Sequence, residues 1–111
     1  MKKLFLVACI SASIASFGTA QADETETIKQ AISGKTIVSG TAEIKLSKNG
    51  RMTGKAGSTT YKGAWTVRDG KFCRTITEPK KWAGTECQPT KLGGGIISLT
   101  GRNGPADWAI K

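Results

Sequence analysis

The most informative part of the sequence for the architecture is residues 65–73, which read Trp65-Thr66-Val67-Arg68-Asp69-Gly70-Lys71-Phe72-Cys73. An Asp-Gly pair between two alternating apolar runs is a strong signal for a two-residue hairpin turn. Such a turn places Val67 opposite Phe72 and Trp65 on the same face, and alternation extends that face back to Tyr61. We therefore predict a hairpin with Tyr61, Trp65, Val67 and Phe72 in the core and Cys73 pointing away from it.

A second hairpin is predicted at residues 44–52. A strict two-residue turn at Asn49-Gly50 would send Met52 to the face opposite Leu46. A three-residue turn, with Gly50 in the left-handed region as a bulge, pairs Leu46 with Met52 instead. The hydrophobic register favours the three-residue turn.

Short runs rich in Thr, Ile, Val, Tyr and Trp recur after residue 34, with Gly, Asn and Asp between them. This is the pattern of an antiparallel meander. The expected strands are 35–39, 41–47, 51–56, 59–67, 71–76, 84–89, 96–100 and 107–111. Closing so many strands into a barrel removes the exposed edges of the sheet. We predict an all-β fold, a small antiparallel meander barrel of about 7–8 strands, with a β-sandwich as the alternative.

Glycines fall inside or beside these expected strands, where bends and close backbone approach are needed. They are Gly40, Gly54, Gly63 and Gly101.

Residues 1–22 have the features of a cleavable signal peptide. Lys2 and Lys3 form a basic start, residues 4–17 are an apolar run, and Ala20-Gln21-Ala22 is a small-x-small cleavage site. The run is shorter than the roughly 20 residues that a bilayer span needs. Residues 6–9, Leu-Val-Ala-Cys, also fit a lipoprotein attachment site, but the apolar run continues well beyond them. We expect cleavage before residue 23 and a periplasmic mature protein without a membrane span.

The expected organisation is a signal peptide at 1–22, an N-terminal segment at 23–34 and a barrel domain at 35–111. In the N-terminal segment Asp23 and Glu26 have the spacing of a capping box, and Gly34 follows as a terminator. Ile28 and Ile32 share one helical face. We expect a short helix or a disordered segment here.

Cys73 and Cys87 are the two cysteines that remain after residue 22. An even pair in an exported protein is most simply a disulfide, and a domain of this size needs reinforcement because it buries only about 60–65% of its unfolded surface. The C-x-x-C spacing of oxidoreductases is absent, and the chain has no histidine to complete a zinc site. We predict a structural disulfide between Cys73 and Cys87 and no metal site.

The chain is strongly basic, with 17 Lys and Arg against 8 Asp and Glu and a net charge of +9. Such a field attracts anions, although the basic residues are spread singly, as on a solvated surface. Few aromatic residues are present to stack bases, so no nucleic-acid partner is expected.

The absence of histidine excludes the common nucleophile–base pairs and most zinc and iron sites. What remains is a pair of carboxylates, as in a glycosidase, and the candidates are Glu43, Asp69, Glu78, Glu86 and Asp107. A turn accounts for Asp69, and Glu78 and Glu86 flank a polar loop. We expect no enzymatic activity and no cofactor.

Lys80, Lys81 and Trp82 lie within the expected disulfide loop and form the candidate binding loop. Such a loop can enter a partner's cleft, as in small exported inhibitors, because a disulfide reduces the entropy lost on binding. Alternatively, Trp82 folds back over a barrel end. We predict a monomeric, non-enzymatic periplasmic binding protein whose partner is a protein or an anionic envelope polymer. A small-ligand carrier of lipocalin-like type is the alternative.

Several motifs extend over residues 44–110. They are Asn49-Gly50-Arg51-Met52-x-Gly54, the G-x-W-x-x-x-x-G-x-F-C-R segment from Gly63 to Arg74, Cys87-Gln88, and Asp107-Trp108-Ala109-Ile110. With these motifs the chain resembles a family of small exported proteins of alphaproteobacteria. The resemblance implies a periplasmic, disulfide-bonded all-β protein and no particular activity.

Some members of that family carry the name dihydrodipicolinate reductase. That reaction needs a nicotinamide cofactor, and no G-x-G-x-x-G follows a strand and opens a helix in this sequence. Gly93-Gly94-Gly95 is expected in a loop that leads into a strand.

Overall fold

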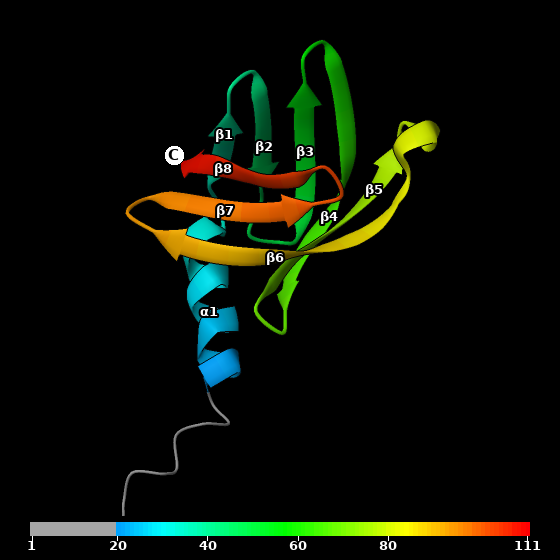
Figure 1. The fold of residues 1–111 in the computed structure, drawn as a ribbon. Coiled ribbons are helices and arrows are strands. Elements are labelled where there is room, and N and C mark those ends of the chain that lie inside the picture. The colour runs from blue at the N-terminus through cyan, green and yellow to red at the C-terminus, as the bar shows by residue number, and fades with distance from the viewer. Residues whose placement is uncertain (1–19) are drawn as a thin grey trace, which may run out of the picture.

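A computed structural model describes residues 20–111, with side chains from residue 24 onward. One helix, α1, precedes eight strands that form a closed barrel (Figure 1). The elements are α1 (Ala20–Ile32), β1 (Thr36–Ser39), β2 (Ala42–Leu46), β3 (Arg51–Ala56), β4 (Thr59–Arg68), β5 (Lys71–Glu78), the 3₁₀ turn η2 (Lys80–Trp82), β6 (Gly84–Gly93), β7 (Ile96–Gly101) and β8 (Gly104–Ile110). This confirms the predicted all-β meander barrel with a short helix.

The barrel closes where the first strand meets the last. Ile37 pairs with Ile110, and Val38 pairs with Ala109. Just beyond these pairs, the backbone N–H groups of Thr36 and Lys111 each donate to the other's carbonyl oxygen, at 3.2 and 2.7 Å. Each strand therefore has a hydrogen-bonded neighbour on both sides, which a two-sheet sandwich would not provide.

Both predicted hairpins have the expected register. Leu46 pairs with Met52, and Val67 pairs with Phe72. Asp69 and Gly70 adopt φ angles of 53° and 72°, as a two-residue turn with two left-handed residues requires. The predicted strand boundaries also hold closely, except that β6 and β8 are longer than expected because tight turns at residues 94–95 and 102–103 let the pairing continue.

α1 lies at one end of the barrel, beside the β4–β5 turn, and packs against the hydrophobic core of the barrel (Figure 1). Ile28 and Ile32 of α1 are buried in this core, and the Thr25 hydroxyl accepts a hydrogen bond from the Gly70 N–H at 2.7 Å. The core comprises these two residues with Ile37, Ile44, Leu46, Met52, Tyr61, Trp65, Val67, Phe72, Ile76, Ile97 and Leu99. The four core residues predicted from the sequence are all among them.

The helix is longer than predicted at its N-terminal end. It already includes Ala20, so Asp23 lies within it rather than at an N-cap position, and the predicted capping box is wrong here. Its other end agrees with the prediction, since Gly34 follows at φ 77°. The expected signal peptide falls largely on residues 1–19, outside the described part of the chain.

Two glycines allow close approach inside the barrel wall. A Cβ on Gly63 would lie 1.8 Å from the carbonyl oxygen of Thr75, so β4 and β5 touch backbone to backbone at this bulge. A Cβ on Gly54 would lie 2.2 Å from the ring of Tyr61, which lies across this glycine from the neighbouring strand. Gly63 confirms the expectation of close backbone approach at a strand glycine, whereas at Gly54 an aromatic ring approaches and at Gly40 nothing lies within 4 Å of an added Cβ.

Cys73 and Cys87 form the predicted disulfide and are directly opposite each other on β5 and β6. Their neighbours Phe72, Arg74 and Gln88 line the interior, so alternation along each strand places the disulfide on the outer face. It thus ties together two strands without occupying any of the interior.

The double variant Cys73→Ala with Cys87→Ala tests this cross-link. The bond closes a loop between residues 14 apart, which in the chain-entropy model is worth about 3 kcal/mol. We expect the free energy of unfolding from urea titration to fall by that amount. An unchanged value would show that the disulfide adds nothing to the closed sheet.

Gly63→Ala tests the backbone contact. We expect a loss of about 2–3 kcal/mol in unfolding free energy, because backbone rather than a side chain must move to admit the methyl group. Gly93→Ala is the matched control, since nothing lies within 4 Å of its added Cβ. Its effect should stay below about 1 kcal/mol, and equal losses in both variants would contradict this account.

Candidate functional site: an open cavity in the barrel

The half of the barrel away from α1 encloses a cavity of about 630 Å³. Its walls come from seven strands, and η2 and the β7–β8 turn stand at its mouth. Apolar side chains of the core, including Ile44, Phe72 and Leu99, form its deeper part. The cavity is therefore continuous with the packed core but is not filled by it.

Small residues explain why the interior is hollow at this end. Eight strands leave an interior that large side chains can just fill. Toward the mouth, however, the inward positions on β2, β3, β7 and β8 are occupied by Ala42, Ala56, Gly101 and Ala106. These side chains are too short to meet across the barrel, so space remains.

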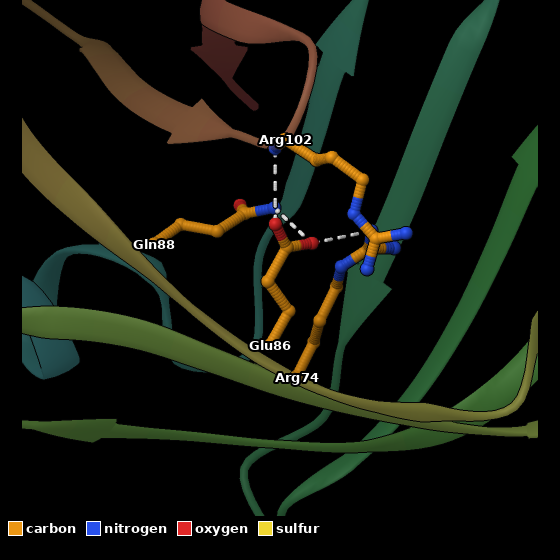
Figure 2. A network of polar contacts seen from close by, with 4 residues as sticks. All are labelled: Arg74, Glu86, Gln88 and Arg102. Carbon is orange, nitrogen blue, oxygen red and sulfur yellow. Dashed lines mark hydrogen bonds and ion pairs between the residues drawn. The ribbon is translucent and has the colours of Figure 1, made fainter.

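One wall of the cavity carries a polar network centred on Glu86 (Figure 2). Arg74, which pairs with Glu86 across β5 and β6, donates to its Oε1 from Nη2 at 3.1 Å. Gln88 Nε2 donates to the same oxygen at 3.1 Å. The backbone N–H of Arg102, in the β7–β8 turn, donates to Oε2 at 3.0 Å. One carboxylate thus links β5, β6 and the β7–β8 turn.

The network controls the ionisation of Glu86. Burial alone would raise the pKa of this carboxyl. The hydrogen bonds from Arg74 and Gln88, the charge of Arg74 and the Arg102 N–H oppose that effect, and the pKa of Glu86 lies below its ordinary value of 4.5. Glu86 is therefore an anion at neutral pH, and its charge is already matched by protein donors.

Arg74 has more donors than the network uses. Its Nε is buried and has no hydrogen-bond partner within residues 24–111. A buried donor without a partner carries a desolvation cost. Because Nε is closed to solvent, a guest in the cavity meets Arg74 through the charge of its guanidinium, whose side chain is 27% exposed, rather than through this nitrogen.

Two aromatic rings meet near the mouth. The rings of Tyr61 and Trp82 lie 5.5 Å apart at a tilt of 56°, and both residues line the cavity. Burial raises the pKa of Tyr61, while the positive charge of Arg74 acts in the opposite direction. Trp82 remains 37% exposed, so its ring belongs to both the rim and the outer surface.

The structure places the predicted binding loop at this mouth. Lys80, Lys81 and Trp82 form η2, and Lys81 and Trp82 line the cavity. Trp82 folds toward the barrel end, which was the alternative considered for it. Among the five candidate carboxylates only Glu86 lines the cavity within the described chain. Glu86 lies in β6, within the expected strand 84–89 and just after the loop that it was expected to flank.

Sequence reasoning did not identify Arg74, Gln88 and Arg102 as site residues. The alternation of inward and outward residues along β5 could have identified Arg74. It is two residues from Phe72 and therefore shares its inward face. For Arg102, in a turn, no comparable signal exists. Its part in the site depends on how β7 and β8 are placed beside β6.

Within residues 24–111 no three His, Cys, Asp or Glu side chains gather into a potential metal site. The described helix α1 is neither long enough nor apolar enough to cross a membrane. Comparison of the chain with protein-family models, with curated proteins and with solved structures finds no match. The resemblance drawn from the sequence motifs therefore stays a prediction.

Acid stability tests the electrostatics of Glu86. Because its pKa is lowered by folding, the carboxylate stabilises the folded state at pH values above 4.5. That contribution is lost as the pH falls from 4.5 through the lower folded pKa. We expect the unfolding free energy of the wild type to fall more steeply in this window than that of Glu86→Gln.

Denaturant titration across the acid range measures these slopes. Glu43→Gln is the control, because it removes a carboxylate from β2, outside the network. It should leave the wild-type slope in place. Parallel curves for the wild type and Glu86→Gln would contradict the assignment.

Proposed function

We propose that this protein binds a small molecule with an apolar body in the open half of its barrel. The observation that carries the proposal is the cavity itself, whose volume of about 630 Å³ falls in the range of about 300–1,000 Å³ typical of small-molecule sites. The site combines apolar walls with a few convergent polar groups, which is the usual composition of such pockets. This is the small-ligand alternative among the functions expected from the sequence.

The barrel is suited to binding because the walls of its cavity belong to a closed, cross-linked sheet. Closed pairing holds the walls, and the disulfide ties β5 to β6 beside the polar network. A preformed site loses little conformational entropy on binding. Together with the expected export, this supports a non-enzymatic carrier or sensor that works outside the cytoplasm.

The place of Trp82 also favours a ligand in the barrel over a partner protein or an envelope polymer. A residue that anchors a protein interface typically presents its ring to the partner. The ring of Trp82 instead packs against Tyr61 and lines the cavity. In this proposal η2 frames the entrance and Trp82 covers part of the bound molecule.

Ala56→Phe tests whether ligands enter the barrel. Ala56 lines the cavity, so a phenyl ring there occupies the space of the ligand. We expect the wild type to bind the neutral fluorescent probe N-phenyl-1-naphthylamine and the variant to bind it at least about tenfold more weakly, a loss of about 1.4 kcal/mol. Probe fluorescence during titration gives the dissociation constants.

Ala64→Phe is the matched control, because it makes the same substitution at an exposed position that does not line the cavity. Its affinity should equal that of the wild type, and both variants must keep a cooperative melting transition. A wild type that does not bind the probe, or equal losses in both variants, would refute the proposed site. Native mass spectrometry of protein from its own compartment would then identify the physiological ligand.

A further inference from the structure

The charges that line the cavity do not balance. Within the described chain its charged lining residues are Arg74, Lys81, Arg102 and Glu86, which are three cations and one anion. Glu86 is already held by three donors. Excess positive charge therefore remains in a partly enclosed space that mixes polar and apolar walls, where Coulombic interactions are stronger than in open water.

The two guanidinium groups are placed to act on the same guest. Figure 2 shows the side chain of Arg74 approaching from β5 and that of Arg102 approaching from the β7–β8 turn, so that both guanidinium groups end on the same side of Glu86 in this view. Arg74–Glu86 is the one ion pair among the described residues, and Arg102 contributes only its backbone N–H to the network. The guanidinium of Arg102 thus remains available as a donor, whereas Nε of Arg74 is closed to solvent.

These donors have a clear chemical preference. A guanidinium presents N–H groups in a planar fork that matches the oxygens of a carboxylate or a phosphate. A neutral acceptor would leave the excess charge uncompensated. An anionic oxygen compensates it.

We infer that the ligand is an amphipathic anion. Its carboxylate or phosphate head accepts hydrogen bonds from the Arg102 guanidinium beside the charge of Arg74, and its apolar body lies against Ile44, Phe72 and Leu99. This inference rests on the proposed function and adds the chemical class of the ligand. The position of Trp82 at the mouth allows its ring to cover the bound molecule.

Three probes with the same alkyl chain separate the contributions to binding. Decanoate and decyl phosphate carry the two anionic heads, and decanol is the neutral reference. Each is titrated against the wild type loaded with N-phenyl-1-naphthylamine, and displacement gives its affinity. We expect at least one anion to bind about tenfold more tightly than decanol, as a charge-assisted hydrogen bond in a cavity provides. Which anion binds more tightly identifies the head group.

Arg102→Gln is the main variant, because the hydrogen bond from its backbone N–H, and hence the network, is kept. It should lower the preference for the anion over decanol about fivefold or more and leave the affinity for decanol unchanged. Arg74→Lys is the second variant. It retains a positive charge beside Glu86 and removes the planar fork, so a loss of preference would show that the guanidinium of Arg74 helps to hold the head group.

Arg68→Gln is the control for the general basic surface, since Arg68 is exposed on β4 and does not line the cavity. It should keep the wild-type preference. Equal losses in Arg68→Gln and Arg102→Gln, or a wild type that binds decanol as tightly as both anions, would overturn the anionic assignment and leave cavity binding intact. Failure of all three decyl compounds and of the naphthylamine probe would refute the proposed function as well.

Discussion

Pairing of β1 with β8 is the constraint on which the rest of the structure depends. Once these strands meet, every strand has two partners, and inward and outward positions alternate around the whole wall. The core, the cavity and the outer disulfide are consequences of that alternation. An open sheet with the same local hairpins would expose the residues that now line the interior.

Closure also explains how one interior serves two purposes. At the α1 end large side chains meet across the barrel, and Ile28 and Ile32 of the helix complete the core. At the other end small residues leave the walls apart. The packed half stabilises the fold, so the hollow half is free to accommodate a ligand. In the proposed function this division is what makes the barrel a binding protein.

The polar network around Glu86 connects strands of the barrel and also provides the charged groups that line the cavity. Glu86 is held by donors from two strands and a turn, and its own charge is matched there. The contact to Glu86 holds the guanidinium of Arg74, and the backbone contact of Arg102 holds the turn that carries the second guanidinium. A donor held in a partly enclosed cavity discriminates between charged and neutral guests better than mobile lysines on the surface.

The local hairpins could be predicted from the sequence because turn chemistry and a two-residue period act between near neighbours. The Asp69-Gly70 turn and the Leu46–Met52 register are examples, and the pairing of Cys73 with Cys87 followed from there being no other partner for either residue in the expected mature chain. The cavity was not predicted, because its walls come from strands that only closure brings together. Gly101 and Arg102 show the difference: in the sequence they mark a strand end and a turn, but in the barrel they lie beside Glu86 and Gln88. The sequence alone therefore determined which residues form strands and how neighbouring strands pair, whereas the tertiary structure decided where space and unmatched charge coincide, since both depend on contacts between residues distant in the chain.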